Sequence, residues 1–275
     1  MAQIVAGFML PHDPLIAAIP DAPSTAQRET CMNAFATIAD RLRALQVDTV
    51  VVIGDDHYTI NSPACIPQCM IGIGDVEGPY EPWLGIPRAR IPNNEPLAHH
   101  IMQTGFDLGV DWAVSKSLVL DHSTTIPVHY AVRPAGDVRA IPVYLNSGLE
   151  PLISSKRAYQ VGQSIGKAIA SWSGTERVAI LGTGGISHWP GMAQMGQVNV
   201  EFDKKIISLV ERGDVQSLIA LSDEEILNDA GNGALEIKNW ICAMGALGDW
   251  HGELIAYEAV HEWVCGCGFI EMKEA

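Results

Sequence analysis

A glycine-rich stretch that follows an apolar run limits what this chain can fold into. Residues 178–180 read Val-Ala-Ile, and residues 181–191 read Leu-Gly-Thr-Gly-Gly-Ile-Ser-His-Trp-Pro-Gly. The first run is typical of a buried strand, and closely spaced glycines let the backbone bend where side chains would not fit. A tight strand-to-loop turn is the plainer interpretation of this stretch alone. In an open α/β sheet, however, the same stretch brings His188 to the edge where strands end and active sites form.

Three further apolar runs also lead to a histidine. The runs and their histidines are residues 3–10 with His12, residues 47–53 with His57, and residues 117–120 with His122. Parallel strands of one sheet end at the same edge, so all four histidines can converge there. A single histidine at a strand end is most often hydrogen bonded and structural, but four together favour a shared site.

Helical patterns between these runs indicate the fold class. Ser24 and Gln27 have the spacing of a capping box, and apolar residues follow at helical intervals as far as Leu45. A second amphipathic helix is expected over residues 151–172. Alternating strands and helices predict an α/β fold with a central, mostly parallel or mixed sheet flanked by helices. The chain has no internal repeat and no break in composition, so residues 1–275 are expected to form a single domain.

Two regions of the chain give other patterns. Residues 61–94 carry many prolines and glycines around a short apolar piece, which predicts an extended loop region. After the glycine-rich stretch the pattern is mainly helical, and we expect helices at 198–212, 223–230 and 233–247. A final strand over residues 254–260 is expected to close the chain.

Acidic residues outnumber basic ones, with 32 Asp and Glu against 17 Lys and Arg, and the net charge is −15. Such a chain repels phosphate backbones and anionic lipids, which argues against nucleic acid and membrane partners. The apolar runs are shorter than the ~20 residues that a membrane span needs. The first residues lack the basic region of a signal peptide, so we expect a cytoplasmic protein. Its six cysteines form no CxxC pair and are expected to be reduced.

Histidines combined with one carboxylate are typical ligands of divalent first-row metals. Two histidines and a carboxylate leave open positions on Fe(II) for a substrate and for oxygen. The spacing itself contains no metal motif, because His12 and His57 are 45 positions apart and no HExxH sequence occurs. The residues alone therefore suggest a metal site without defining it.

Five pieces of the chain resemble the class III extradiol ring-cleavage dioxygenases, the superfamily of the catalytic β subunit of protocatechuate 4,5-dioxygenase. Gly-Thr-Gly-Gly-x-Ser-His is the most specific piece, and together the pieces span nearly the whole chain in the family's order. They are the first strand with His12, Gly-Asp-Asp-His at 54–57, Asp-His-Ser-Thr-Thr-Ile-Pro at 121–127, the glycine-rich piece at 182–188, and Leu-Glu-Ile at 235–237.

The resemblance implies a catalytic domain that cleaves a catechol-type or aminophenol-type ring with O2 and Fe(II). It makes His12, His57 and Glu236 the iron ligands. His188 would be the acid/base residue that takes a proton from the substrate. His122 would contact the substrate hydroxyls or oxygen and help in protonation.

Several neighbours of the histidines are weaker candidates. Asp56 is expected to orient a ligand ring, although an aspartate that forms the turn is an equal alternative. Tyr58, Thr124 and Trp189 are expected to line the pocket, although Trp189 is also suited to packing the turn. Some relatives complete the pocket with a small second subunit, so such a subunit or a homo-oligomer is expected here.

Two classes of alternative remain open at this point. A metal-free binding or scaffold protein would keep the fold and use the histidines only structurally. A zinc-dependent enzyme, either ring-cleaving or hydrolytic, would use the same ligands without iron. The metal that the purified protein holds distinguishes these alternatives.

Overall fold

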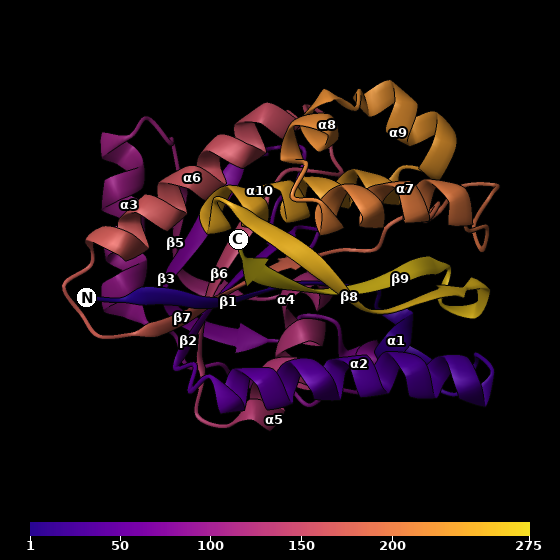
Figure 1. The fold of residues 1–275 in the computed structure, drawn as a ribbon, viewed down its shortest axis with the longest axis horizontal. Helices are drawn as coiled ribbons and strands as arrows, with labels where there is room; N and C mark the ends of the chain where they lie inside the picture. Colours follow the sequence, from indigo (N-terminus) through magenta and orange to yellow (C-terminus); the bar gives the residue numbers. More distant parts are fainter.

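A mixed nine-stranded sheet runs through the computed structural model, which describes residues 1–275 (Figure 1). The strand order is β4-β3-β6-β2-β7-β1-β9-β8, and β5 pairs with β3. The strands are β1 Gln3–Leu10, β2 Thr49–Asp55, β3 Cys69–Gly78, β4 Ala89–Arg90, β5 Ala113–Val119, β6 Arg139–Leu145, β7 Arg177–Thr183, β8 Trp250–Val260 and β9 Cys265–Glu274.

The four central strands β6, β2, β7 and β1 are parallel to one another. The pairs β3–β6, β3–β4, β1–β9 and β8–β9 are antiparallel, and β3–β5 is parallel. Because the central strands run the same way, their carboxyl ends lie along one edge of the sheet. The expectation of a single-domain α/β fold with a mixed sheet flanked by helices is confirmed.

Helices cover both faces of the sheet, with α2 on one side and α3, α6, α7 and α10 on the other (Figure 1). Strand β2 is buried along its whole length, as a strand covered on both faces must be. The helices are α1 Leu15–Ala18, α2 Thr25–Ala44, α3 Glu95–Asp107, α4 His122–Pro127, α5 Arg133–Ala135, α6 Ser155–Ser171, α7 Val200–Glu211, α8 Val215–Ala220, α9 Asp223–Ala230 and α10 Ile237–Leu247.

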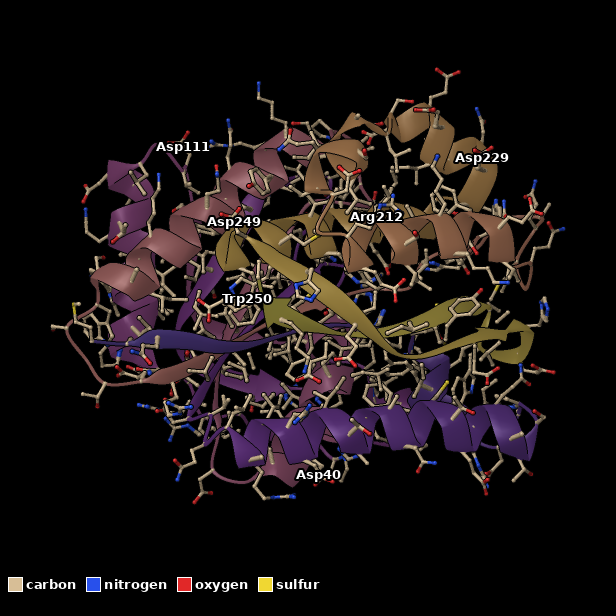
Figure 2. All side chains as sticks on the ribbon, in the orientation of Figure 1. Asp40, Asp111, Arg212, Asp229, Asp249 and Trp250 are labelled. Carbon is tan, nitrogen blue, oxygen red and sulfur yellow. The ribbon has the colours of Figure 1, made fainter.

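Local sequence signals explain where two of these helices begin. The Ser24 hydroxyl accepts a hydrogen bond from the Gln27 N–H at the start of α2, at 3.3 Å. Ser222 and Glu225 form a full capping box at the start of α9. Charged side chains cover the outer surfaces, as the labelled Asp40 in α2 and Asp229 in α9 illustrate (Figure 2). No helix combines the length and the apolar character that crossing a membrane requires.

Two predictions about the strands are wrong in extent. Residues 61–94 are not only loop, because they contain the ten-residue strand β3 and the short strand β4. The strand predicted at 254–260 is the end of β8, and β9 follows it in a hairpin. Glycines in β3 and β9 interrupt the pattern of side chains by which a strand is recognised in the sequence. A Cβ on Gly74 would lie 2.3 Å from the Lys116 carbonyl oxygen, and one on Gly266 would lie 1.9 Å from the Asp203 carboxylate.

Helices α6 and α10 pack so closely that their contact requires glycine. A Cβ on Gly162 in α6 would lie 1.9 Å from the carbonyl oxygen of Cys242 in α10. A Cβ on Gly245 in α10 would lie 2.3 Å from the carbonyl oxygen of Tyr159 in α6. Since α10 directly follows Glu236, this contact also fixes the position of that residue against the sheet.

We predict that Gly162→Ala lowers the free energy of unfolding by about 2 kcal/mol, because the added methyl group overpacks the contact with a backbone carbonyl. Helix propensity alone predicts the opposite sign, a gain of about 1 kcal/mol. Urea unfolding of the two proteins measures the difference. Gly148→Ala is the matched control, since its Cβ would have no neighbour closer than 3.8 Å. Unchanged or increased stability of Gly162→Ala would contradict the packing argument.

Candidate metal centre and active site

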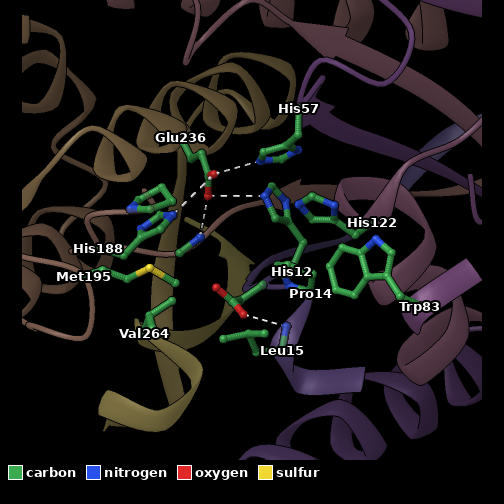
Figure 3. Close-up of a pocket in the computed structure, with 13 residues that line it drawn as sticks. His12, Pro14, Leu15, His57, Trp83, His122, His188, Met195, Glu236 and Val264 are labelled. Carbon is green, nitrogen blue, oxygen red and sulfur yellow. Dashed lines mark hydrogen bonds and ion pairs between the residues drawn. The ribbon is translucent and has the colours of Figure 1, made fainter. Parts of the chain in front are cut away.

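Four histidines and one glutamate surround a cavity of about 280 Å³ at the carboxyl edge of the parallel strands. His12 follows β1, His57 follows β2, and His188 follows β7 by five residues. His122 is the first residue of α4, and Glu236 ends the 3₁₀ turn Gly233–Glu236 before α10. Figure 3 shows all five side chains directed toward one another. The structure therefore brings together the strand-end histidines that the sequence placed at one edge.

The Glu236 carboxylate lies at the centre of three imidazoles. Its Oε2 is 3.3 Å from His12 Nε2, and its Oε1 is 3.3 Å from His57 Nε2 (Figure 3). The same Oε1 is 3.4 Å from His188 Nε2. Ligand atoms of His12, Asp55, His57 and Glu236 all lie within 4.8 Å of one another, which makes them a group that could hold one metal ion.

Thr183 at the end of β7 fixes the orientation of His12. The His12 Nδ1 lies 2.9 Å from the Thr183 hydroxyl oxygen. That hydroxyl also lies 3.0 Å from the carbonyl oxygen of Ile53 and 3.1 Å from that of Ser123. Its one proton goes to a carbonyl, so the oxygen accepts from His12 Nδ1–H. The His12 Nε2 then carries a lone pair, and it is buried with no hydrogen-bond partner.

Asp121 fixes the orientation of His57 in the same way. Its Oδ2 accepts hydrogen bonds from the His57 Nδ1–H, at 3.0 Å, and from the His57 backbone N–H, at 3.1 Å. Burial alone would raise the pKa of Asp121, but the hydrogen bond from His57 and its charge lower that pKa well below the usual value. The sequence had instead favoured Asp56 for orienting a ligand ring.

The chemistry of the converging atoms shows whether a metal ion fits this site. With Nδ1 of both rings donating outward, the Nε2 lone pairs of His12 and His57 face the Glu236 carboxylate, and all of these atoms are acceptors. Acceptors at 3.3 Å repel one another unless a cation or added protons lie between them. Two imidazole nitrogens and a carboxylate are a fitting donor set for a divalent first-row metal. The donor set and the orphaned His12 Nε2 therefore fit a metal ion.

Asp55 adds a second carboxylate to this group. Its oxygens lie 3.8 Å from His12 Nε2 and 3.7 Å from His57 Nε2. The Asn239 side-chain amide in α10 donates to Asp55 Oδ1 at 2.9 Å and to the carbonyl oxygen of Thr183. Burial and the nearby Glu236 raise the pKa of Asp55.

The glycines of the 181–191 stretch make room for Glu236. The backbone N–H of Gly185 donates to Glu236 Oε2 at 2.9 Å. Gly184 has a φ of 144°, and a Cβ there would lie 2.6 Å from the Cβ of Glu236. Burial alone would raise the pKa of Glu236, but His12 and His188 lower it well below the usual value.

His188 lies against Glu236 with its ring held by the backbone. Its Nδ1–H donates to the Ile186 carbonyl oxygen at 3.2 Å, so its Nε2 faces Glu236 and the cavity. Burial alone would lower the pKa of His188, but the charge of Glu236 raises it to about 10. A cation bound at the carboxylate would offset that charge and favour the neutral ring.

Glu81 is a site residue that the sequence did not reveal. Its Oε1 accepts a hydrogen bond from the His122 Nδ1–H at 2.6 Å, and both side chains are buried. The centre of the His122 ring is 4.0 Å from that of His57. Burial, followed by the charge of His57, lowers the pKa of His122. Glu81 lies within the segment that was predicted as loop, where no periodic pattern marks a buried carboxylate.

The comparison with known families identifies the family to which this fold belongs. Residues 6–268 match the family described as the catalytic LigB subunit of aromatic ring-opening dioxygenase. The chain belongs to this family. Membership in the family makes the protein an aromatic ring-cleavage dioxygenase. The family implies a metal cofactor, and the residues that converge here form a group that could hold a metal ion.

Individual relatives of this dioxygenase extend the comparison. The chain is 25% identical over 316 residues to the 2,3-dihydroxyphenylpropionate/2,3-dihydroxicinnamic acid 1,2-dioxygenase of Escherichia coli strain K12, covering 96% of this chain and 97% of that protein. The protein of the same name from strain O157:H7 gives the same values. The fold is similar to uncharacterized protein JW3007 from Escherichia coli K12, with a TM-score of 0.59, 9% identity and coverage of 97% and 98% of the two chains.

Four residues that the sequence suggested as weaker site candidates do not line the cavity of the dioxygenase. Asp56 accepts hydrogen bonds from backbone N–H groups of residues 59–61 and forms the turn, while Asp121 orients His57. Tyr58 is exposed at a positive φ. Thr124 is bonded to the Tyr144 hydroxyl, and Trp189 lies beside Gly231, where a Cβ would come within 2.7 Å of its ring. Adjacency to a site histidine in the sequence did not bring these side chains into the cavity.

We predict that Gly233→Ala displaces the His188 ring of the dioxygenase, because the new Cβ would lie 2.1 Å from Nε2 and 2.2 Å from Cδ2. The ring-opening rate is expected to fall about 100-fold, the usual effect of losing acid/base catalysis, which the resemblance assigns to His188. Turnover and a crystal structure of the variant measure the rate and the ring position. Gly148→Ala is again the control and should retain the rate. A Gly233→Ala enzyme with unchanged turnover would show that this close approach is unimportant.

Proposed function

We propose that this dioxygenase is an Fe(II)-dependent extradiol enzyme that opens catechol-type or aminophenol-type rings with O2. The observation that carries the proposal is the convergence of the His12 and His57 Nε2 atoms on Glu236 inside a cavity that two further histidines line. Three protein ligands leave open positions at a metal for both substrate and oxygen. The Escherichia coli relatives are named for a substrate with a dihydroxyphenyl group, which supports a catechol as the substrate class.

His12, His57 and Glu236 would hold the iron. When bound, Fe(II) lowers the pKa of a coordinated catechol hydroxyl and lets electrons pass from the aromatic ring to O2. Thr183 and Asp121 keep the Nδ1 protons of the two ligand histidines, so both Nε2 atoms remain available as neutral donors. Two neutral histidines and one carboxylate keep the ligand charge low, which favours the approach of an anionic substrate.

His188 would accept the proton of a substrate hydroxyl at Nε2. Its Nδ1–H stays bonded to the Ile186 carbonyl oxygen, so the ring receives and returns protons on the cavity side only. His122 would bond the second hydroxyl or oxygen through Nε2, since Glu81 takes its Nδ1–H. Glu81 helps to hold a proton on His122, while burial and the charge of His57 lower the pKa of that ring, so a protonated His122 would give up its proton readily.

A further part of the proposal concerns the partner. Trp83 and Met195 line the cavity yet are 55% and 53% exposed. Large apolar side chains at a cavity mouth are often covered by substrate or by another chain. A small second subunit or another copy of this chain remains our proposal for completing the pocket.

The test is anaerobic reconstitution with Fe(II), followed by oxygen uptake and the appearance of a yellow ring-fission product from a panel of catechols and aminophenols. We expect one equivalent of iron and consumption of O2. The protein loaded with Zn(II) is the control and should consume none. A zinc-dependent hydrolase would hold zinc without oxygen uptake, and a scaffold protein would retain no stoichiometric metal. Either result would overturn the proposal.

We predict different effects for substitution of a proposed metal ligand, His57, and of the proposed acid/base residue, His188. His57→Ala should weaken Fe(II) binding at least about 100-fold, because it removes a ligand. His188→Ala should retain iron and lower the ring-opening rate about 100-fold to 10,000-fold. Metal content after gel filtration and turnover at saturating iron separate the two effects. Exposed His99→Ala is the control. Loss of iron from His188→Ala would mean that the division of roles is wrong.

A further inference from the structure

Asp13 is a cavity carboxylate that the ligand set and the acid/base residues do not use. It lines the cavity and its side chain is almost fully buried, with 6% of the residue exposed. Its Oδ1 accepts a hydrogen bond from the Leu15 backbone N–H at 2.8 Å, which fixes the side chain. No hydrogen bond or ion pair joins Oδ2 to another residue. A carboxylate oxygen without a partner on a cavity wall is suited to accept a hydrogen bond from a ligand.

The rest of the cavity wall offers no Lys or Arg for a substrate substituent. Outside the histidines, Asp13 and Glu236, the lining consists of glycine and apolar residues. These residues are Pro14, Leu15, Trp83, Gly185, Pro190, Met195 and Val264. A carboxylate buried beside them would lose its hydration without gaining a Lys or Arg partner. The net charge of −15 adds repulsion of the same sign.

We infer that Asp13 selects the ring substituent of the substrate, an inference that rests on the proposed function. The favoured substrates carry a neutral or cationic hydrogen-bond donor, such as a hydroxyl or amino group, and no carboxylate. Asp13 Oδ2 accepts the hydrogen bond of that group, while the apolar wall packs against the remaining ring surface. This preference is opposite to the one that the names of the Escherichia coli relatives suggest, since the side chain of dihydroxyphenylpropionate ends in a carboxylate.

Three catechols of similar size test the inference: 3,4-dihydroxybenzylamine, 3,4-dihydroxybenzyl alcohol and 3,4-dihydroxybenzoate. Their dissociation constants are measured by calorimetry with the Zn(II)-loaded protein, which binds without turnover, and kcat/KM is measured with Fe(II). We expect the amine and the alcohol to bind at least about tenfold more tightly than the benzoate. Asp13→Asn keeps the shape of the side chain and an acceptor for Leu15. The Asp13→Asn variant should reduce the ratio of amine affinity to benzoate affinity at least about tenfold. The amine should bind more weakly and the benzoate more tightly.

Asp40→Asn is the control for charge, because it removes the same charge from the exposed face of α2 (Figure 2). Asp13→Ser serves as a second variant, since serine also accepts a hydrogen bond from a following backbone N–H. A wild-type preference for the benzoate, or an unchanged ratio in both Asp13 variants, overturns the inference. If the zinc protein discriminates as expected but iron gives no ring opening, the proposed function fails and the selectivity of Asp13 stands.

Discussion

The arrangement of three imidazoles around the Glu236 carboxylate is the constraint on which the rest of the site depends. Each ring turns one nitrogen toward the carboxylate because its other nitrogen is already bonded. The bonding partners are the Thr183 hydroxyl, the Asp121 carboxylate and the Ile186 carbonyl oxygen. These partners come from separate segments of the chain, so only the folded sheet edge brings them together. The orientation of the three rings therefore depends on the tertiary structure, because polar groups behind the cavity wall fix it.

Such a site is costly for the folded chain when no cation is present. Buried acceptors face one another, and burial raises the pKa of Asp55 and raises that of Asp13 to about 6. The close contact of α6 with α10 opposes this cost, because it holds Glu236 against the sheet. Glycines at the strand ends and in both helices allow that closeness. Concentrating destabilising groups in one place, with dense packing behind them, is a common feature of enzyme sites.

The sequence predicted that the histidines lie close together because this follows from a general property of parallel sheets. Parallel strands end at one edge, and apolar runs followed by histidine are visible in a single chain. Glu81 and the choice of Asp121 over Asp56 were not accessible in this way. Both depend on how loops return to the sheet edge, which local patterns do not encode. The strand β9 escaped prediction because Gly266 and Gly268 serve close packing against Asp203 and Ile186, and they remove the alternation that marks a strand.

The charges around the cavity explain how one fold can serve different aromatic substrates. Glu236, Asp55 and Asp13 contribute three carboxyl groups, whereas the lining contains no Lys or Arg. Without a Lys or Arg beside it, a carboxylate on the substrate would gain no ionic partner from the wall, so the proposed site disfavours such a substituent. In the proposed site His12 would hold the metal, whereas Asp13, one position beyond it, would select the substrate. Separating these two tasks on adjacent residues lets specificity change without disturbing the metal.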